Sequence, residues 1–150
     1  MQRGMADYRA QGAALTSPYM LGMLAESYGA IGELEHGLAA IAEALDLANT
    51  HDERWWEAEL YRLQAELRLQ QDTPDVLQVA TDLQQALKVA REQEAKSLEL
   101  RAATSLARLL RQQGYAAEAH ELLAPLYGWF TEGFNTADLK DAQALLTELT

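Results

Sequence analysis

The sequence predicts an all-α protein, an α-solenoid of antiparallel helical hairpins with about eight helices. Ala, Leu, Glu and Gln dominate its 150 residues, which include only three prolines and nine glycines, and this composition favours helices over strands. A pattern of large, small and glycine residues also recurs at the same offsets in two segments, which is typical of helical repeat proteins. The recurring residues are Leu24, Ala25, Tyr28 and Gly32 in one segment and Leu106, Ala107, Leu110 and Gly114 in the other.

The first hairpin, over residues 18–48, follows a helix expected over residues 3–15. Ser17 and Pro18 predict its start, because serine caps exposed helix amides and proline suits the first helical position. The first helix of the pair is expected to end near Gly32, since glycine readily adopts the left-handed conformation that closes helices. Its partner helix has apolar residues at spacings of three and four.

The second hairpin is expected over residues 52–92. Thr50 and Glu53 have the spacing of a capping box and predict the start of its first helix. Thr73-Pro74 repeats the serine–proline pattern of the first hairpin and predicts the start of the second helix.

The third hairpin is expected over residues 95–130, with its turn at Gly114. Pro125 falls inside its second helix and predicts a kink or an early end near Leu123, because proline removes a backbone hydrogen bond. A C-terminal capping helix over residues 136–149 completes the array. The short connections make neighbouring helices antiparallel, so residues 1–150 are expected to form a single domain.

Composition excludes several classes of function. The net charge of −11 argues against a nucleic-acid partner, which requires a basic surface. The chain has no cysteine for disulfides or thiolate metal sites, which is compatible with a cytoplasmic protein. No apolar run approaches the roughly 20 residues needed to span a bilayer, so no membrane partner is expected.

The sequence offers no sign of catalysis. It lacks a glycine-rich phosphate loop, and its three histidines, His36, His51 and His120, are far apart. The paired carboxylates fall in turns or on polar helix faces, and nothing in the pattern buries them, as general acid–base catalysis would require. We therefore expect a noncatalytic protein without cofactor or metal.

The recurring residues resemble the tetratricopeptide repeat (TPR). In this family the first helix of each repeat carries a large residue, a small residue and an aromatic one, and a glycine marks the turn. The resemblance implies a TPR-like superhelix whose first helices line a concave face, where partners often bind. The matching residues are Leu24, Ala25, Tyr28, Gly32, Gly37, Ile41 and Ala44, and then Leu106, Ala107, Leu110, Gly114, Ala119 and Leu123.

Three segments also resemble the C-terminal repeat regions of large bacterial signalling proteins. In those proteins an NTPase module, often beside an adenylate cyclase or a DNA-binding domain of a transcriptional regulator, precedes the repeats. The resemblance implies that the chain is a fragment of such a protein, with the helix over residues 3–15 belonging to an upstream repeat. The segments are 57–63, 96–109 and 123–134.

Aligning the repeat pattern predicts which residues lie on the concave face. Arginine binds carboxylates through two parallel hydrogen bonds, so an acidic peptide segment or an adjacent domain of the parent protein is the expected partner. A second interpretation stays open, in which these arginines pair with Glu66, Glu99 and neighbouring helices. The predicted residues are Tyr19, Met23, Tyr61, Arg62, Arg68, Arg101, Arg108 and Arg111.

Trp55 and Trp56 point about 100° apart on a helix, so both cannot face one core. Trp56 is expected in the core and Trp55 at a rim, where it packs between repeats or contacts a partner. Two alternative functions remain. One is a small-molecule effector sensor near Trp55, Tyr61 and Trp129, and the other is a self-assembly segment that forms a homodimer through an exposed terminal hairpin.

Overall fold

The computed structural model describes residues 17–150, which form seven α-helices and no strand. The all-α prediction is therefore confirmed for this part of the chain, whereas the helix expected over residues 3–15 lies outside the described residues. No helix between residues 17 and 150 combines the length and the apolar character needed to cross a membrane. The helices are α2 (Pro18–Ala30), α3 (Leu34–Thr50), α4 (Glu57–Leu69), α5 (Val76–Glu92), α6 (Lys96–Gln112), α7 (Ala116–Trp129) and α8 (Ala137–Leu149).

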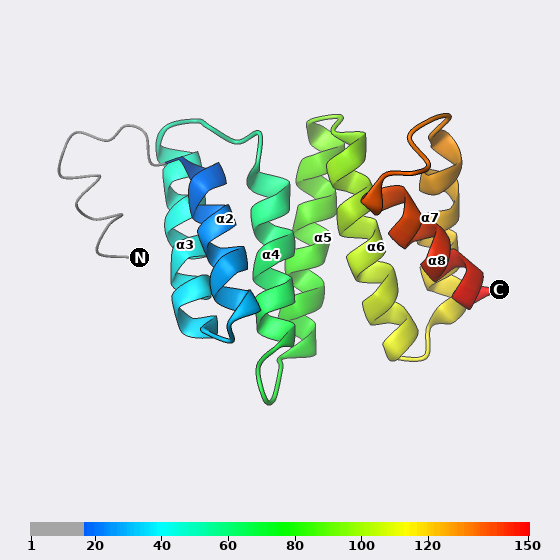
Figure 1. Cartoon of the computed structure of the whole chain (residues 1–150), viewed down its shortest axis with the longest axis horizontal. Coiled ribbons are helices and arrows are strands. Elements are labelled where there is room, and N and C mark those ends of the chain that lie inside the picture. The colour runs from blue at the N-terminus through cyan, green and yellow to red at the C-terminus, as the bar shows by residue number, and fades with distance from the viewer. Residues whose placement is uncertain (1–16) are drawn as a thin grey trace.

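The seven helices follow one another along the long axis of the molecule, from α2 and α3 at one end to α7 and α8 at the other (Figure 1). Each helix contacts the next in sequence, and the even-numbered helices also contact one another, α2 with α4, α4 with α6 and α6 with α8. Among the described residues, α3, α5 and α7 do not contact each other. We call α2, α4, α6 and α8 the even layer and α3, α5 and α7 the odd layer.

Several predicted helix ends are confirmed. Ser17 Oγ accepts a hydrogen bond from the Met20 amide at 3.1 Å, and Pro18 is the first residue of α2. Gly32 and Gly114 have φ values of +79° and +90°, in the left-handed region that favours glycine. Both hairpin turns therefore form where the glycines predict them.

The capping box predicted at Thr50 and Glu53 is wrong. Helix α3 continues through Thr50, and the Glu53 amide donates to the Ala48 carbonyl at 3.0 Å, which closes the C-terminus of α3. Asp52 supplies the left-handed residue with φ +56°. The residues after Thr50 thus close the C-terminus of α3 by bonding its free carbonyl groups, and they do not start a helix. Helix α4 begins only at Glu57.

The start predicted at Thr73-Pro74 for the second helix of the second hairpin is also wrong. Asp75 is the N-cap of α5, and its carboxylate accepts a hydrogen bond from the Gln78 amide at 3.2 Å. Aspartate caps helices at least as well as threonine, so the cap lies two residues further along the chain.

Helix α7 continues through Pro125 to Trp129, so an early end near Leu123 is not observed. Pro125 is exposed, as is Glu121 one turn before it. The Glu121 carbonyl, which loses its helical donor to proline, is therefore available to solvent. Leu123 and Leu126 remain buried on the opposite side of this helix.

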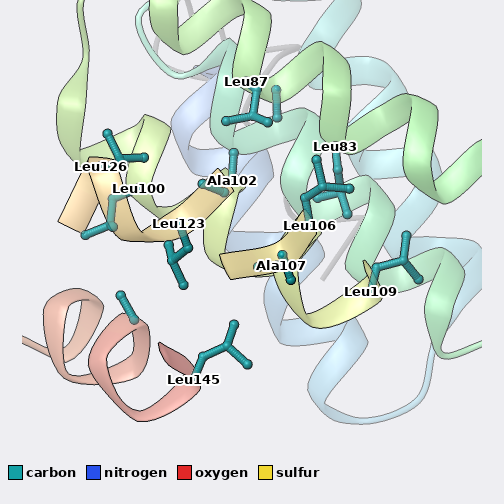
Figure 2. Close-up of a cluster of buried hydrophobic side chains, with 14 of the residues drawn as sticks. Leu83, Leu87, Leu100, Ala102, Leu106, Ala107, Leu109, Leu123, Leu126 and Leu145 are labelled. Carbon is teal, nitrogen blue, oxygen red and sulfur yellow. The ribbon is translucent and has the colours of Figure 1, made fainter. Parts of the chain in front are cut away.

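Leucine and alanine make up most of the larger core, which runs through α5, α6, α7 and α8. Figure 2 shows leucines of these helices, including Leu83, Leu106 and Leu123, together with the small residue Ala102. A second cluster joins α2, α3 and α4 around Leu21, Ile41 and Leu60. Alanines between the leucines allow the helices to pack closely.

Candidate functional site

The structure separates the residues of α4 that the sequence placed on one face. Arg68 donates to the buried Asp82 carboxylate of α5, and Tyr61 packs against Ala58, Val89 and neighbouring residues. Burial raises the pKa of Tyr61, and the negative charges of Glu57 and Asp82 raise it further. Tyr61 and Arg68 therefore belong to the contact between α4 and α5.

Tyr19, Trp55 and Trp56 form an aromatic cluster at one end of the even layer. The Tyr19 ring stacks on Trp55 with 5.7 Å between ring centroids and meets Trp56 edge-on at 5.2 Å. Trp56 is partly buried against the smaller core, whereas Trp55 is 59% exposed. Trp56 is thus more buried than Trp55, as expected, but it is only partly buried, and both residues lie in the turn before α4 instead of on a helix. Met23, one turn after Tyr19, is exposed as well.

The aromatic cluster joins one side of α2 to the residues just before α4. Tyr19, Met23 and Glu26 lie at spacings of four and three along α2 and so share one side of the helix. Tyr19 contacts Trp55, which lies two residues before the start of α4. We call this side of α2, α4, α6 and α8 the even-layer surface.

Behind this surface, Glu59 is a buried carboxylate, 2% exposed. Arg62 binds it through two hydrogen bonds, of which the Nε one is 3.0 Å long. Arg101 Nη1 of α6 lies 3.1 Å from Glu59 Oε1. Burial alone would lower the pKa of Arg62, but the hydrogen bonds and charge of Glu59, with Glu66 and Glu26, together raise it. These three groups tie α4 to α6.

Arg101 and the other two arginines of α6, Arg108 and Arg111, face carboxylates of α8. Arg101 Nε lies 3.4 Å from Asp138, Arg108 Nη2 lies 3.5 Å from Asp141, and Arg111 donates to Glu148. Each arginine predicted for the concave face thus has a carboxylate partner within the chain. The partners differ from the predicted Glu99, which binds Arg91 and Lys96 instead. Glu66 lies 3.9 Å from Arg62. The expected pairing with carboxylates of neighbouring helices is confirmed for Arg68, Arg101, Arg108 and Arg111.

A pocket of about 260 Å³ opens between α4, α6 and α8, and we call it the arginine pocket. A second hollow of about 180 Å³ adjoins it, because Arg108 and Asp141 line both. The sequence did not predict that Asp138 and Asp141 of α8 would face the arginines of α6. The two aspartates are three residues apart, but the register between two helices depends on packing along their whole length. The arginine pocket is lined by Arg62, Arg101, Thr104, Ser105, Arg108, Ala137, Asp138 and Asp141.

Trp129 belongs to a different part of the molecule. Its ring lies under the Lys96 ammonium, 5.4 Å from the ring centroid, in an open hollow that Arg91, Glu94 and Glu99 also line. No ring contact described for residues 17–150 joins Trp129 to Trp55. The residues suggested for an effector sensor thus lie in separate clusters.

Within residues 17–150, no group of three or more acidic or histidine side chains could hold a metal ion. His36 instead lies 3.1 Å from Glu33 in the exposed first turn of α3. Neither the family models nor the curated proteins compared with this chain give a match. Any function is therefore inferred from the geometry itself.

Proposed function

We propose that this chain is a noncatalytic interaction scaffold that binds a protein or peptide on its even-layer surface. The observation that carries the proposal is that Tyr19, Met23 and Trp55 are exposed and that the Tyr19 ring stacks on Trp55. Tryptophan and tyrosine are enriched among the residues of binding hot spots. We further propose that the fold is a TPR-like α-solenoid, because the sequence pattern resembles that family. We also propose that the chain is a fragment of a larger bacterial signalling protein, because three segments resemble the repeat regions of such proteins.

The arrangement of the helices supports a concave even-layer surface. The even-numbered helices contact one another, whereas those of the odd layer are kept apart by the even ones. A two-layer stack whose helices are closer in one layer curves toward that layer. Such curvature creates the extended binding surface that helical repeat proteins use.

The ion pairs of Arg62, Arg101 and Arg108 indicate which chemical groups a bound peptide should carry. Arg62 and Arg101 share the buried Glu59, so their charge is largely compensated. Among residues 17–150, the carboxylate contact of Arg108 is with the exposed Asp141, at 3.5 Å. We therefore expect a peptide with an apolar side chain for the Tyr19–Trp55 cluster and a carboxylate that competes with Asp141 for Arg108.

Unbiased peptide selection against the whole chain tests the proposal. The selected peptides should bind at least tenfold more weakly to Trp55→Ala, since truncation of a central aromatic contact costs about 1.4 kcal/mol or more. Leu77→Ala is the matched control, because Leu77 is 81% exposed on α5 of the odd layer. The proposal fails if both variants bind these peptides as tightly as the unmodified chain.

The other functions weighed for this chain remain proposals of lower rank. Self-assembly through the first hairpin is supported by Met20 and Ile31, which are both exposed on or next to α2. Light scattering over a range of concentrations would reveal a homodimer, and replacement of both residues by Gln should abolish it.

A further inference from the structure

The arginine pocket interrupts the apolar packing of α6 with a stripe of polar residues. Arg101, Thr104, Ser105 and Arg108 lie at spacings of three and four, so they share one side of the helix. Residues at these spacings usually supply the apolar contact between packed helices. Here they line a hollow of about 260 Å³.

Ser105 provides a hydrogen-bonding group without a partner inside this pocket. The residue is only 4% exposed. Its neighbour Thr104 donates to the Leu100 carbonyl at 2.8 Å, but no hydrogen bond of the Ser105 hydroxyl is present among the described residues. Trp56 Nε1 is the one side-chain polar atom of this part of the chain that is both sealed from solvent and unpaired. The Ser105 hydroxyl is therefore open to the pocket that it lines.

Arginines of α6 and aspartates of α8 form only long ion pairs around the pocket. The contacts from Arg101 to Asp138 and from Arg108 to Asp141 measure 3.4 and 3.5 Å and make no hydrogen bond. Elsewhere between helices, Arg91 lies 3.0 Å from Glu99 and hydrogen-bonds to it. Both the guanidinium groups of α6 and the carboxylates of α8 thus retain bonding capacity toward a molecule in the hollow that they line.

We propose that the arginine pocket binds the zwitterion of a small α-amino acid. The carboxylate of the ligand would accept hydrogen bonds from Arg108 and the Ser105 hydroxyl, and its ammonium group would donate to Asp138 and Asp141. The two charges of an α-amino acid are on neighbouring carbons, which matches an arginine and an aspartate that lie 3.5 Å apart at the wall of one hollow.

A zwitterion fits this charge arrangement better than an anion does. A phosphate would meet the arginines but would also face Asp138 and Asp141, and like charges within a few ångströms repel. A ligand with only a carboxylate would leave the two aspartates without a new partner. This site shares Arg108 with the proposed peptide binding, but it needs no contact with the Tyr19–Trp55 cluster. Ser105→Ala and Trp55→Ala therefore test the two sites separately.

Titration of the full chain followed by two-dimensional NMR tests the site. The probes are L-alanine, propionate, which lacks the amino group, and ethylamine, which lacks the carboxylate. L-alanine should cause saturable shifts of the backbone amides around Ser105 and Asp138. Propionate and ethylamine, at the same concentrations, should cause no saturable shift at these amides.

Ser105→Ala, a nearly isosteric change, should raise the Kd of L-alanine about tenfold, the loss expected for one hydrogen bond to a charged group. Arg108→Gln should weaken binding at least as much. Ser97→Ala is the control, because Ser97 is exposed in the first turn of the same helix and outside the pocket. It should leave the Kd unchanged.

Three results would overturn the proposal: no saturable shift with L-alanine, equal binding of propionate, or a Ser105→Ala variant with an unchanged Kd. In the last case the serine hydroxyl bonds only to water. None of these results affects the peptide experiment, whose variants lie on α5 and at the start of α4. The two proposals can therefore fail separately.

Discussion

Gly37 determines how closely α3 can approach α2 and α4. A Cβ atom at this position would lie 3.2 Å from the Ala25 backbone carbonyl and 3.1 Å from Leu67. The backbone oxygen cannot move without shifting α2. Gly37 is one of the residues that resemble the tetratricopeptide repeat, and the structure shows the contacts that require a small residue at this position.

Gly37→Ala should therefore lower the free energy of unfolding by about 1–2 kcal/mol, with overpacking exceeding the better helix propensity of alanine. Gly128→Ala is the matched control, because no atom lies within 4 Å of the added Cβ in α7. The control should raise stability by up to about 1 kcal/mol. Urea unfolding measures both, and equal effects of the two substitutions would contradict this packing account.

Glu59 shows what single-residue reasoning from the sequence misses. The arginines Arg62 and Arg101 are recognisable as candidates, but their shared partner is three residues from one and forty-two from the other. Only the packing of α4 against α6 brings these groups together. The open choice between a binding surface and internal ion pairs thus depended on helix register, which composition and spacing do not determine.

Glu59→Gln should lower the free energy of unfolding by about 2–3 kcal/mol, because it removes the charge that both arginines share in a buried site. Glu66→Gln is the control on the same helix, since Glu66 is 38% exposed and 3.9 Å from Arg62. Its effect should stay within about 0.5 kcal/mol. Similar losses for both variants in urea unfolding would show that Glu59 has no special role.

At the scale of elements, turns with a left-handed residue close several of the helices. Glycine fills this position after α2 and α6, whereas Asp52 and Glu94, with φ values of +56° and +55°, fill it after α3 and α5. The turns at Gly32 and Gly114 were predictable, because glycine adopts the left-handed conformation more readily than other residues. The polar residues at Asp52 and Glu94 also suit other roles, which is why a helix start was predicted near Asp52.

Glu94→Gly should raise the free energy of unfolding by about 0.5–1 kcal/mol, since the left-handed conformation costs a glutamate roughly 1–2 kcal/mol. Glu94→Gln removes the charge but keeps the Cβ, so it should leave stability nearly unchanged. Thermal unfolding distinguishes the two. If the glutamine variant gains as much as the glycine variant, charge and not backbone conformation explains the effect.

At the scale of the whole molecule, contacts between helices are local along the array. Among the described residues, no helix contacts another more than two positions away in sequence. Composition and repeat spacing predicted this all-α arrangement. They did not predict the arginine pocket, because it requires side chains from α4, α6 and α8 in a specific register.

A chain that ends at residue 134 should keep most of its helicity, although it lacks α8. Amide hydrogen exchange should accelerate in α6 and α7, which lose the contact with Leu139, Ala142 and Leu145. Exchange in α2 and α3 should stay within a factor of about three, because these helices do not contact α8. Uniform acceleration throughout the chain would indicate one cooperative core instead of an array.

The indole N–H signals of the three tryptophans test the central claim, that partners bind the even-layer surface. Trp55 lies on this surface, whereas Trp129 ends α7 in the odd layer. NMR titration of the full chain with a selected peptide should shift the Trp55 signal in proportion to occupancy and leave the Trp129 signal in place. A shift of Trp129 with an unchanged Trp55 would contradict the claim.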